Sequence, residues 1–186
     1  MSDITIIDHS DQVETILGAY RDAIGNDFRA YRGHVYRTIT YAMHFLGGAE
    51  EHRAMVETAL AYHDIGLWTA RDLAYLEPSE ELALADNKRF GFGLDPETLR
   101  AAIHWHHKVT DFQGKDAVVV NAVRKGDWVD ASKGIVRHGL SKAQVARVED
   151  AIDTYGFPAV LQRLAGDLGG NRVAGNLRVL RRVFKW

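Results

Sequence analysis

An adjacent histidine and aspartate, His63 and Asp64, close an alanine-rich stretch of the chain. Neutral imidazole and carboxylate groups are both good ligands of first-row metal ions, so two of them in succession can bind one ion. Two further residues of the same types follow the same order, with His34 upstream and Asp127 downstream. A set of two histidines and two carboxylates leaves positions for water or substrate on a five- or six-coordinate ion. The sequence therefore predicts a site for Mn, Fe, Co, Ni or Zn, and it does not choose among these metals.

The elements that must position these ligands are helices, because apolar residues recur at helical spacing along most of the chain. Asp95 and Pro96 are typical of a helix start, since Asp can cap the first turn and Pro fits its first position. Pro78 is interpreted in the same way, and residues 141–144 have the spacing of a capping box. The apolar run at 117–120 is interpreted as a buried helix rather than a strand.

No repeat, low-complexity segment or change of composition indicates a second domain. We therefore predict an all-α fold in which residues 1–186 form a single-domain bundle of about seven to nine helices. Neighbouring residues of a helix point about 100° apart, so His63 and Asp64 converge on one ion only if it lies close to the helix end. Gly66 would then let the chain turn away. His34 and Asp127 must come from two other helices, as in metal sites of bundle cores.

The bulk composition narrows the class of partner. The chain has 186 residues, with 23 basic and 25 acidic side chains and a net charge of −2. This balance gives no global reason to expect nucleic acid as a partner. Cysteine is absent, the N-terminus lacks the order of a secretion signal, and no apolar run reaches the roughly 20 residues that span a bilayer. We expect a cytoplasmic protein that acts on a small molecule, and the oligomeric state is open.

The ordered residues resemble the HD-domain metal-dependent phosphohydrolase superfamily. His34 is followed three positions later by Arg37, as is frequent for the first metal ligand of that superfamily. The pair His63-Asp64 continues as Ile65-Gly66, which matches its HDIG form. Asp127 opens an Asp-x-x-Asp segment that ends at Asp130. The resemblance covers about residues 30–135, and the expected helices at 141–186 lie outside it.

The resemblance implies that His34, His63, Asp64 and Asp127 bind the metal, with Asp130 in a supporting role. Members with two metals add histidines between the HD pair and the last Asp. In this chain His104, His106 and His107 could serve a second ion, as could Glu77, which stands near the place of a missing histidine. That absence, together with Leu67 at a position where the superfamily often has Lys or His, favours one ion rather than two.

Candidate substrate contacts are cations and aromatic rings. Arg37 could bind a substrate phosphate or pair with a carboxylate, and Lys88 and Arg124 could line an anion pocket or lie on solvated helix faces. Loops around 66–78 and 88–95 are expected to supply the pocket, where the aromatic residues are Trp68, Tyr75, Phe90 and Phe92. Near the C-terminus a charged helix face is expected, formed by Arg178, Arg181, Arg182 and Lys185.

The leading functional hypothesis is metal-dependent hydrolysis of a small phosphate ester or nucleotide. Asp64 would orient the attacking water, and Arg37 with His106 or His107 would stabilise the developing charge. An alternative, motivated by the histidines at 104–107, is a di-iron oxygenase that cleaves a C–P or C–C bond. A hydratase or lyase and a non-catalytic metal-binding regulatory domain are further alternatives.

Overall fold

The computed structural model describes residues 3–170, and these residues form helices without a strand. Eight helices have nine or more residues, which confirms the predicted all-α class and falls within the predicted number. Two more helices, α2 and α5, make a single turn each. In chain order the helices are α1 (Asp11–Ala19), α2 (Arg21–Ile24), α3 (Phe28–Phe45), α4 (Arg53–Tyr62), α5 (Gly66–Thr69), α6 (Leu76–Arg89), α7 (Pro96–Trp105), α8 (Ala117–Ala131), α9 (Lys142–Ala151) and α10 (Phe157–Gly169).

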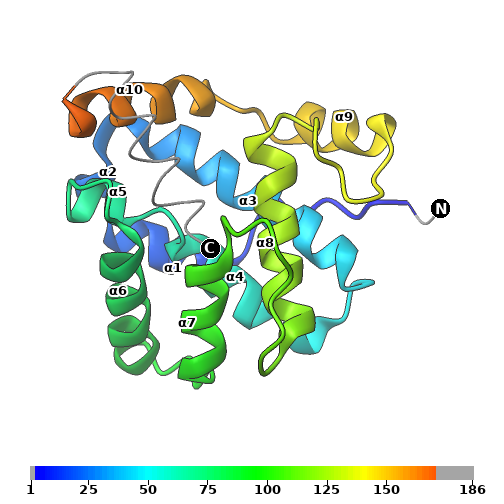
Figure 1. The fold of residues 1–186 in the computed structure, drawn as a ribbon, viewed down its shortest axis with the longest axis horizontal. Helices are drawn as coiled ribbons and strands as arrows, with labels where there is room; N and C mark the ends of the chain where they lie inside the picture. Colours follow the sequence, from blue (N-terminus) through cyan, green and yellow to red (C-terminus); the bar gives the residue numbers. More distant parts are fainter. Residues whose placement is uncertain (1–2, 171–186) are drawn as a thin grey trace.

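Helix α3 is the centre of the bundle. It is buried along most of its length and packs most extensively against α8, with α4 and α10 also in contact. Figure 1 shows α6 and α7 side by side at the bottom of the view, while α10 crosses the top. The main apolar core includes Ile39 from α3, Leu60 from α4 and Val120 from α8. Helix α4 contacts both α3 and α8, and α7 contacts α4 and α8.

Local signals in the sequence account for several helix boundaries. The Asp95 side chain accepts a hydrogen bond from the Thr98 N–H at the start of α7, and Ser141 forms the predicted capping box at the start of α9. The run at 117–120 is helical, as predicted, because it opens the buried helix α8. The expected start at Pro78 is displaced: α6 begins at Leu76, and Pro78 occupies its first turn, where no intrahelical N–H bond is lost.

Helices α3 and α8 approach each other closely at Gly126. A Cβ atom built there would lie 2.7 Å from the Thr38 carbonyl oxygen and 3.1 Å from the Ala42 nitrogen, both on the backbone of α3. Backbone atoms cannot move aside as a flexible side chain would. Glycine at this position therefore sets the distance between the two helices that carry His34 and Asp127.

We expect Gly126→Ala to lower the free energy of unfolding by about 1 to 3 kcal/mol, because the cost of overpacking exceeds the gain in helix propensity. Urea unfolding measures this difference. Gly18→Ala in α1 is the matched control, since nothing lies within 4 Å of its Cβ position, and it should stabilise by up to about 1 kcal/mol. Equal effects of the two substitutions would show that the helix approach is not sterically limited.

Two sequence expectations concern the ends and the surroundings of the chain. Within residues 3–170, no helix combines the length and the apolar character needed to cross a membrane. The charged face expected at 178–185 lies outside the described residues, as does the last part of the expected C-terminal helices at 141–186. Of those helices, α9 and α10 are present, and α10 contacts α3.

Candidate metal centre

The four residues predicted as ligands meet in the middle of the bundle. His34 lies in α3, His63 and Asp64 follow the last residue of α4, and Asp127 lies in α8. All four side chains are buried. His34 Nε2 is 3.4 Å from an Asp127 oxygen, and His63 Nε2 is 3.4 Å from an Asp64 oxygen and 3.6 Å from Asp127. Residues 93 positions apart in sequence thus form one compact cluster of donors.

Two histidines just beyond α7 join this cluster. His106 Nε2 lies 3.5 Å from Asp64 Oδ1, and His107 Nε2 lies 3.9 Å from the same oxygen. His107 Nδ1 also faces Asp127 at 3.5 Å. The donors form two groups with the spacing of a metal site, one with His34 and His63 and the other with His106 and His107, and Asp64 belongs to both.

Three histidine rings are each oriented by a hydrogen bond that their Nδ1 atom makes. His63 Nδ1 lies 2.6 Å from the Leu60 carbonyl oxygen, and His106 Nδ1 lies 2.6 Å from that of Ile103. A carbonyl oxygen only accepts, so each Nδ1 carries the hydrogen and each Nε2 lone pair faces the cluster. His34 Nδ1 likewise donates to Asp130 at 2.7 Å. Metal-binding histidines in proteins are oriented in this way.

These orientations leave donor atoms that need a cation. The Nε2 atoms of His34 and His63 are 3.0 Å apart, so two lone pairs would face each other unless a proton or a metal ion lies between them. Asp64 Oδ1 and His106 Nε2 are buried without a hydrogen-bond partner. An unpaired buried carboxylate oxygen is costly. The donor types and their unmet bonding therefore fit a divalent transition metal.

The cluster combines negatively charged carboxylates with the imidazole rings that face them. Burial opposes charge on Asp127, but the facing histidines His107, His34 and His63 hold its pKa well below the usual range. Burial would lower the pKa of His34, yet its bonds to Asp127 and Asp130 outweigh that effect and raise the pKa to about 9. A metal bound at Nε2 would take the place of this proton.

The pKa of His106 is shifted in the opposite direction from that of His34. Burial, together with the neighbouring His107, lowers the pKa of His106 to about 4. The pKa of Asp64 is also lowered, because His63 and His106 outweigh the effect of burial. At neutral pH the site therefore offers a neutral imidazole at His106 beside an ionised carboxylate at Asp64, which are the forms that bind metal.

Arg37 lies behind His34 and does not line the cavity at the cluster. Its guanidinium forms two bonds to the Asp130 carboxylate, at 2.6 and 2.8 Å, and a third to the Asp153 carbonyl oxygen. The side chain is buried. Of the two alternatives for this residue, the structure shows the carboxylate pair. Asp130 in turn accepts from His34, so Arg37 supports that ring through Asp130.

The other two predicted substrate cations also lie elsewhere, which corrects the expected anion pocket. Arg124 is buried and pairs with Asp111, and it reaches the Lys108 carbonyl oxygen in the segment after α7. Lys88 is exposed on α6. Neither side chain lines the cavity at the cluster. Both residues lie in helices, as the helical spacing of apolar residues predicts. That spacing does not show how far their side chains lie from the metal ligands.

Two of the candidates for a second metal are also outside the cluster. His104 Nδ1 donates to the Glu80 carboxylate at 2.7 Å, and the His104 side chain is 46% exposed. It lies on the face of α7 that packs toward α6, which turns it away from His106. Glu77 is exposed on α6 and belongs to neither donor group. The histidine-rich segment therefore contributes His106 and His107 only.

The cluster opens into a cavity of about 180 Å³. His34, Asp64, His107 and Asp127 form its polar end, and the expected segment 66–78 contributes to its wall. The segment 88–95 does not line it. The rest of the wall comes from the end of α8 and from α10, a helix outside the part of the chain that resembles the HD domain. Apart from the polar end, the wall residues are Leu67, Leu73, Tyr75, Ala131, Leu161, Gln162, Leu164 and Ala165.

Tyr75 is the functional candidate whose role the sequence did not reveal. Burial raises its pKa well above the usual value, so its hydroxyl keeps the proton and donates it to His107 Nε2. Its position in the segment after the HDIG motif was the available signal. The other aromatic candidates pack elsewhere: Trp68 donates to Asp27, and Phe90 and Phe92 lie against each other.

Gly66 is required by a close approach. A Cβ atom at this residue would collide with the Tyr75 carbonyl oxygen and would lie 2.9 Å from Ser79 Oγ. The Gly66 N–H donates to the same hydroxyl at 2.9 Å. The glycine therefore allows the segment that carries Tyr75 to pack against the residues that follow Asp64.

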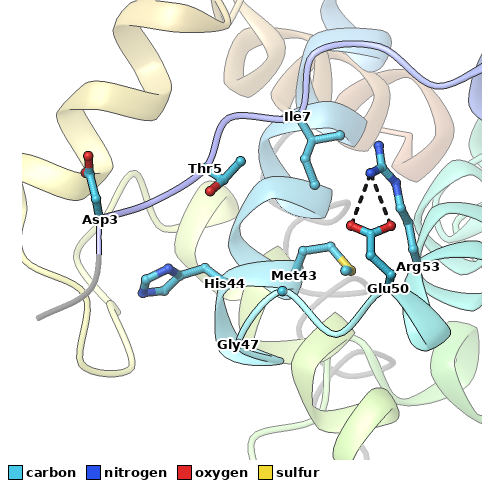
Figure 2. A pocket seen from close by; sticks show the side chains of 9 residues that line it. Asp3, Thr5, Ile7, Met43, His44, Gly47, Glu50 and Arg53 are labelled. Atoms are coloured by element: carbon cyan, nitrogen blue, oxygen red, sulfur yellow. Dashed lines mark hydrogen bonds and ion pairs between the residues drawn. The ribbon is translucent and has the colours of Figure 1, made fainter.

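A second cavity, of about 250 Å³, lies at a different place on the molecule. Figure 2 shows its wall, formed by the N-terminal segment, the end of α3 and the start of α4. Its cation, Arg53, pairs with Glu50 and with Glu57. None of the predicted ligands or substrate contacts lines it, so the cluster at Asp64 is the stronger candidate for a functional site.

No family model, no curated protein and no solved structure matches this chain. The chemistry of the buried cluster and of its cavity therefore carries the functional argument.

Proposed function

We propose that this protein is a member of the HD-domain superfamily and hydrolyses a small phosphate ester with the help of a divalent transition metal. One observation carries the proposal: the Nε2 atoms of His34 and His63 face each other at 3.0 Å, and the Nδ1 of each ring is already engaged by an oxygen acceptor. An arrangement of that kind needs a cation between the rings. Asp64 and Asp127 supply the negative charge that would balance a divalent ion.

His34, His63, Asp64 and Asp127 would hold the ion. When bound, it would lower the pKa of a water molecule and withdraw charge from a phosphoryl oxygen. Asp64 would bind the ion through one carboxylate oxygen, and its other oxygen would accept a hydrogen from the attacking water. His107 lines the cavity with 20% of its side chain exposed, and together with the Tyr75 hydroxyl it would lie beside the bound substrate.

A second candidate function is the di-iron oxygenase. The observation in its favour is that Asp64 belongs to two donor groups, since a shared carboxylate can bridge two ions. Against it, His107 Nε2 is occupied by the Tyr75 hydroxyl, and His104 and Glu77 lie outside the cluster. We therefore rank hydrolysis with one ion first. A purely regulatory domain fits less well, because Asp64 and His107 reach the cavity wall.

The test begins with elemental mass spectrometry on untagged protein purified without added metal. We expect close to one Mn, Fe, Co, Ni or Zn per chain, followed by release of inorganic phosphate from phosphate esters in a broad screen. The Asp64→Ala variant controls for contaminating phosphatases. Two irons per chain with oxygen uptake would favour the oxygenase, and metal-loaded protein that hydrolyses no ester would refute the proposal.

A further inference from the structure

The wall of the cavity has an unusual chemistry for a site that binds a phosphorylated molecule. Beyond the polar end, it consists mainly of aliphatic side chains, among them Leu67 and Leu73 on one side and Leu161 and Leu164 of α10 on the other. The polar side chains among these residues are Tyr75 and Gln162, which are neutral. Apolar walls of this kind bind the apolar part of a ligand, and the few polar groups fix its orientation.

No lysine or arginine of residues 3–170 lines this cavity. Of the predicted cationic contacts, Arg37 pairs with the buried Asp130, and Arg124, itself buried, pairs with the exposed Asp111. A nucleoside di- or triphosphate carries several negative charges, and proteins usually bind them with arginine, lysine or clustered backbone N–H groups. Inside this cavity the positive charge available to a substrate is that of the proposed metal, which suits a single phosphoryl group.

The size of the cavity points in the same direction. At about 180 Å³ it is smaller than the roughly 300 to 1,000 Å³ that is typical of sites for drug-sized ligands. A nucleotide base and ribose together would have to extend beyond it, past Ala131 and Gln162 into an adjoining cavity. A short alkyl chain or a single ring would be enclosed in it.

We propose that the substrate is a phosphate monoester of a small apolar alcohol, with the phosphoryl group at the cluster and the alkyl or aryl group between the leucines. This inference rests on the proposed hydrolase function. In the reaction, a water oxygen bonds to phosphorus and the ester P–O bond breaks. The alcohol leaves with a proton from the water, and inorganic phosphate is the second product, with no change of oxidation state.

The experiment compares kcat/KM for butyl phosphate, methyl phosphate and adenosine monophosphate on the metal-loaded full chain. We expect butyl phosphate to exceed methyl phosphate about tenfold or more, because three further methylene groups are buried. We expect the nucleotide to fall below butyl phosphate. Leu161→Asn should reduce the butyl-to-methyl ratio severalfold, while Leu84→Asn, the same change on α6 outside this cavity, should leave the ratio as in the natural chain.

Each outcome separates the substrate class from the function. Hydrolysis of adenosine monophosphate with the higher kcat/KM would overturn the apolar substrate and leave the phosphohydrolase standing. A butyl-to-methyl ratio below twofold, or a ratio that Leu161→Asn does not change, would do the same. If the metal-loaded protein hydrolysed neither these three esters nor any other ester of the broad screen, both the hydrolase proposal and this inference would be refuted.

Discussion

The Asp64→Asn variant is expected to be purified without metal and to lose more than about a hundredfold of its ester hydrolysis. A hundredfold is the upper range for residues that only support a ligand, and Asp64 is itself placed as a ligand in both donor groups. The amide keeps the shape of the side chain but not the charge that balances a divalent ion. Metal content and initial rates of phosphate release measure the two effects.

Thermal unfolding gives a second readout of the same substitution. A metal at a hundred times its Kd stabilises the folded chain by about 2.7 kcal/mol, so the natural protein should unfold at a lower temperature after chelation. The Asp64→Asn variant should show no such shift. Glu77→Gln is the matched control, because Glu77 is exposed and outside the cluster. This variant should retain the metal and should unfold at a lower temperature after chelation, as the natural protein does. Full metal occupancy in Asp64→Asn would contradict the assignment.

The largest loss of stability is expected for Arg37→Met. Removal of one partner of a buried ion pair leaves an uncompensated charge, which costs about 3 to 5 kcal/mol. The charge left behind is that of Asp130, whose side chain is only 6% exposed. Urea unfolding of the metal-free protein measures the effect without a contribution from metal affinity.

A matched arginine exists in the same helix, α3. Arg32 pairs with Glu14, and the two side chains are 34% and 30% exposed, so Arg32→Met should cost no more than about 1 kcal/mol. A second readout is metal affinity, which should fall about 10- to 100-fold in Arg37→Met, because Asp130 loses the group that orients it toward His34. If both arginine variants lost the same stability, the buried pair with Asp130 would not be the source of the effect.

The fold class was predictable because its signals are local. Helical periodicity, the caps at Asp95 and Ser141, and the helical interpretation of 117–120 depend on residues a few positions apart, and the structure confirms each. The start of α6 was displaced to Leu76, because proline is compatible with any position of a first turn. Boundaries of this kind depend on small differences that tertiary packing decides.

The candidate ligands were also found from the sequence, since a motif fixes their order along the chain, and the structure brings His34, His63, Asp64 and Asp127 together. The cavity wall was not found in full. The sequence of α10 shows an apolar face but not which part of the protein that face covers. The pairing of Arg37 with Asp130 joins residues that are 93 positions apart in the chain. Such contacts become visible only when the packing of the helices is known.

The close approach of α3 and α8 at Gly126 has a consequence for the order of events in folding. The cluster combines His34 with Asp127, so it does not exist until a loop of more than ninety residues has closed. Long-range contacts of this kind form late, after local helices. During synthesis, the first two histidines leave the ribosome well before the aspartate that completes the set. We therefore expect the ion to enter a chain that has already collapsed, and apoprotein to fold without it.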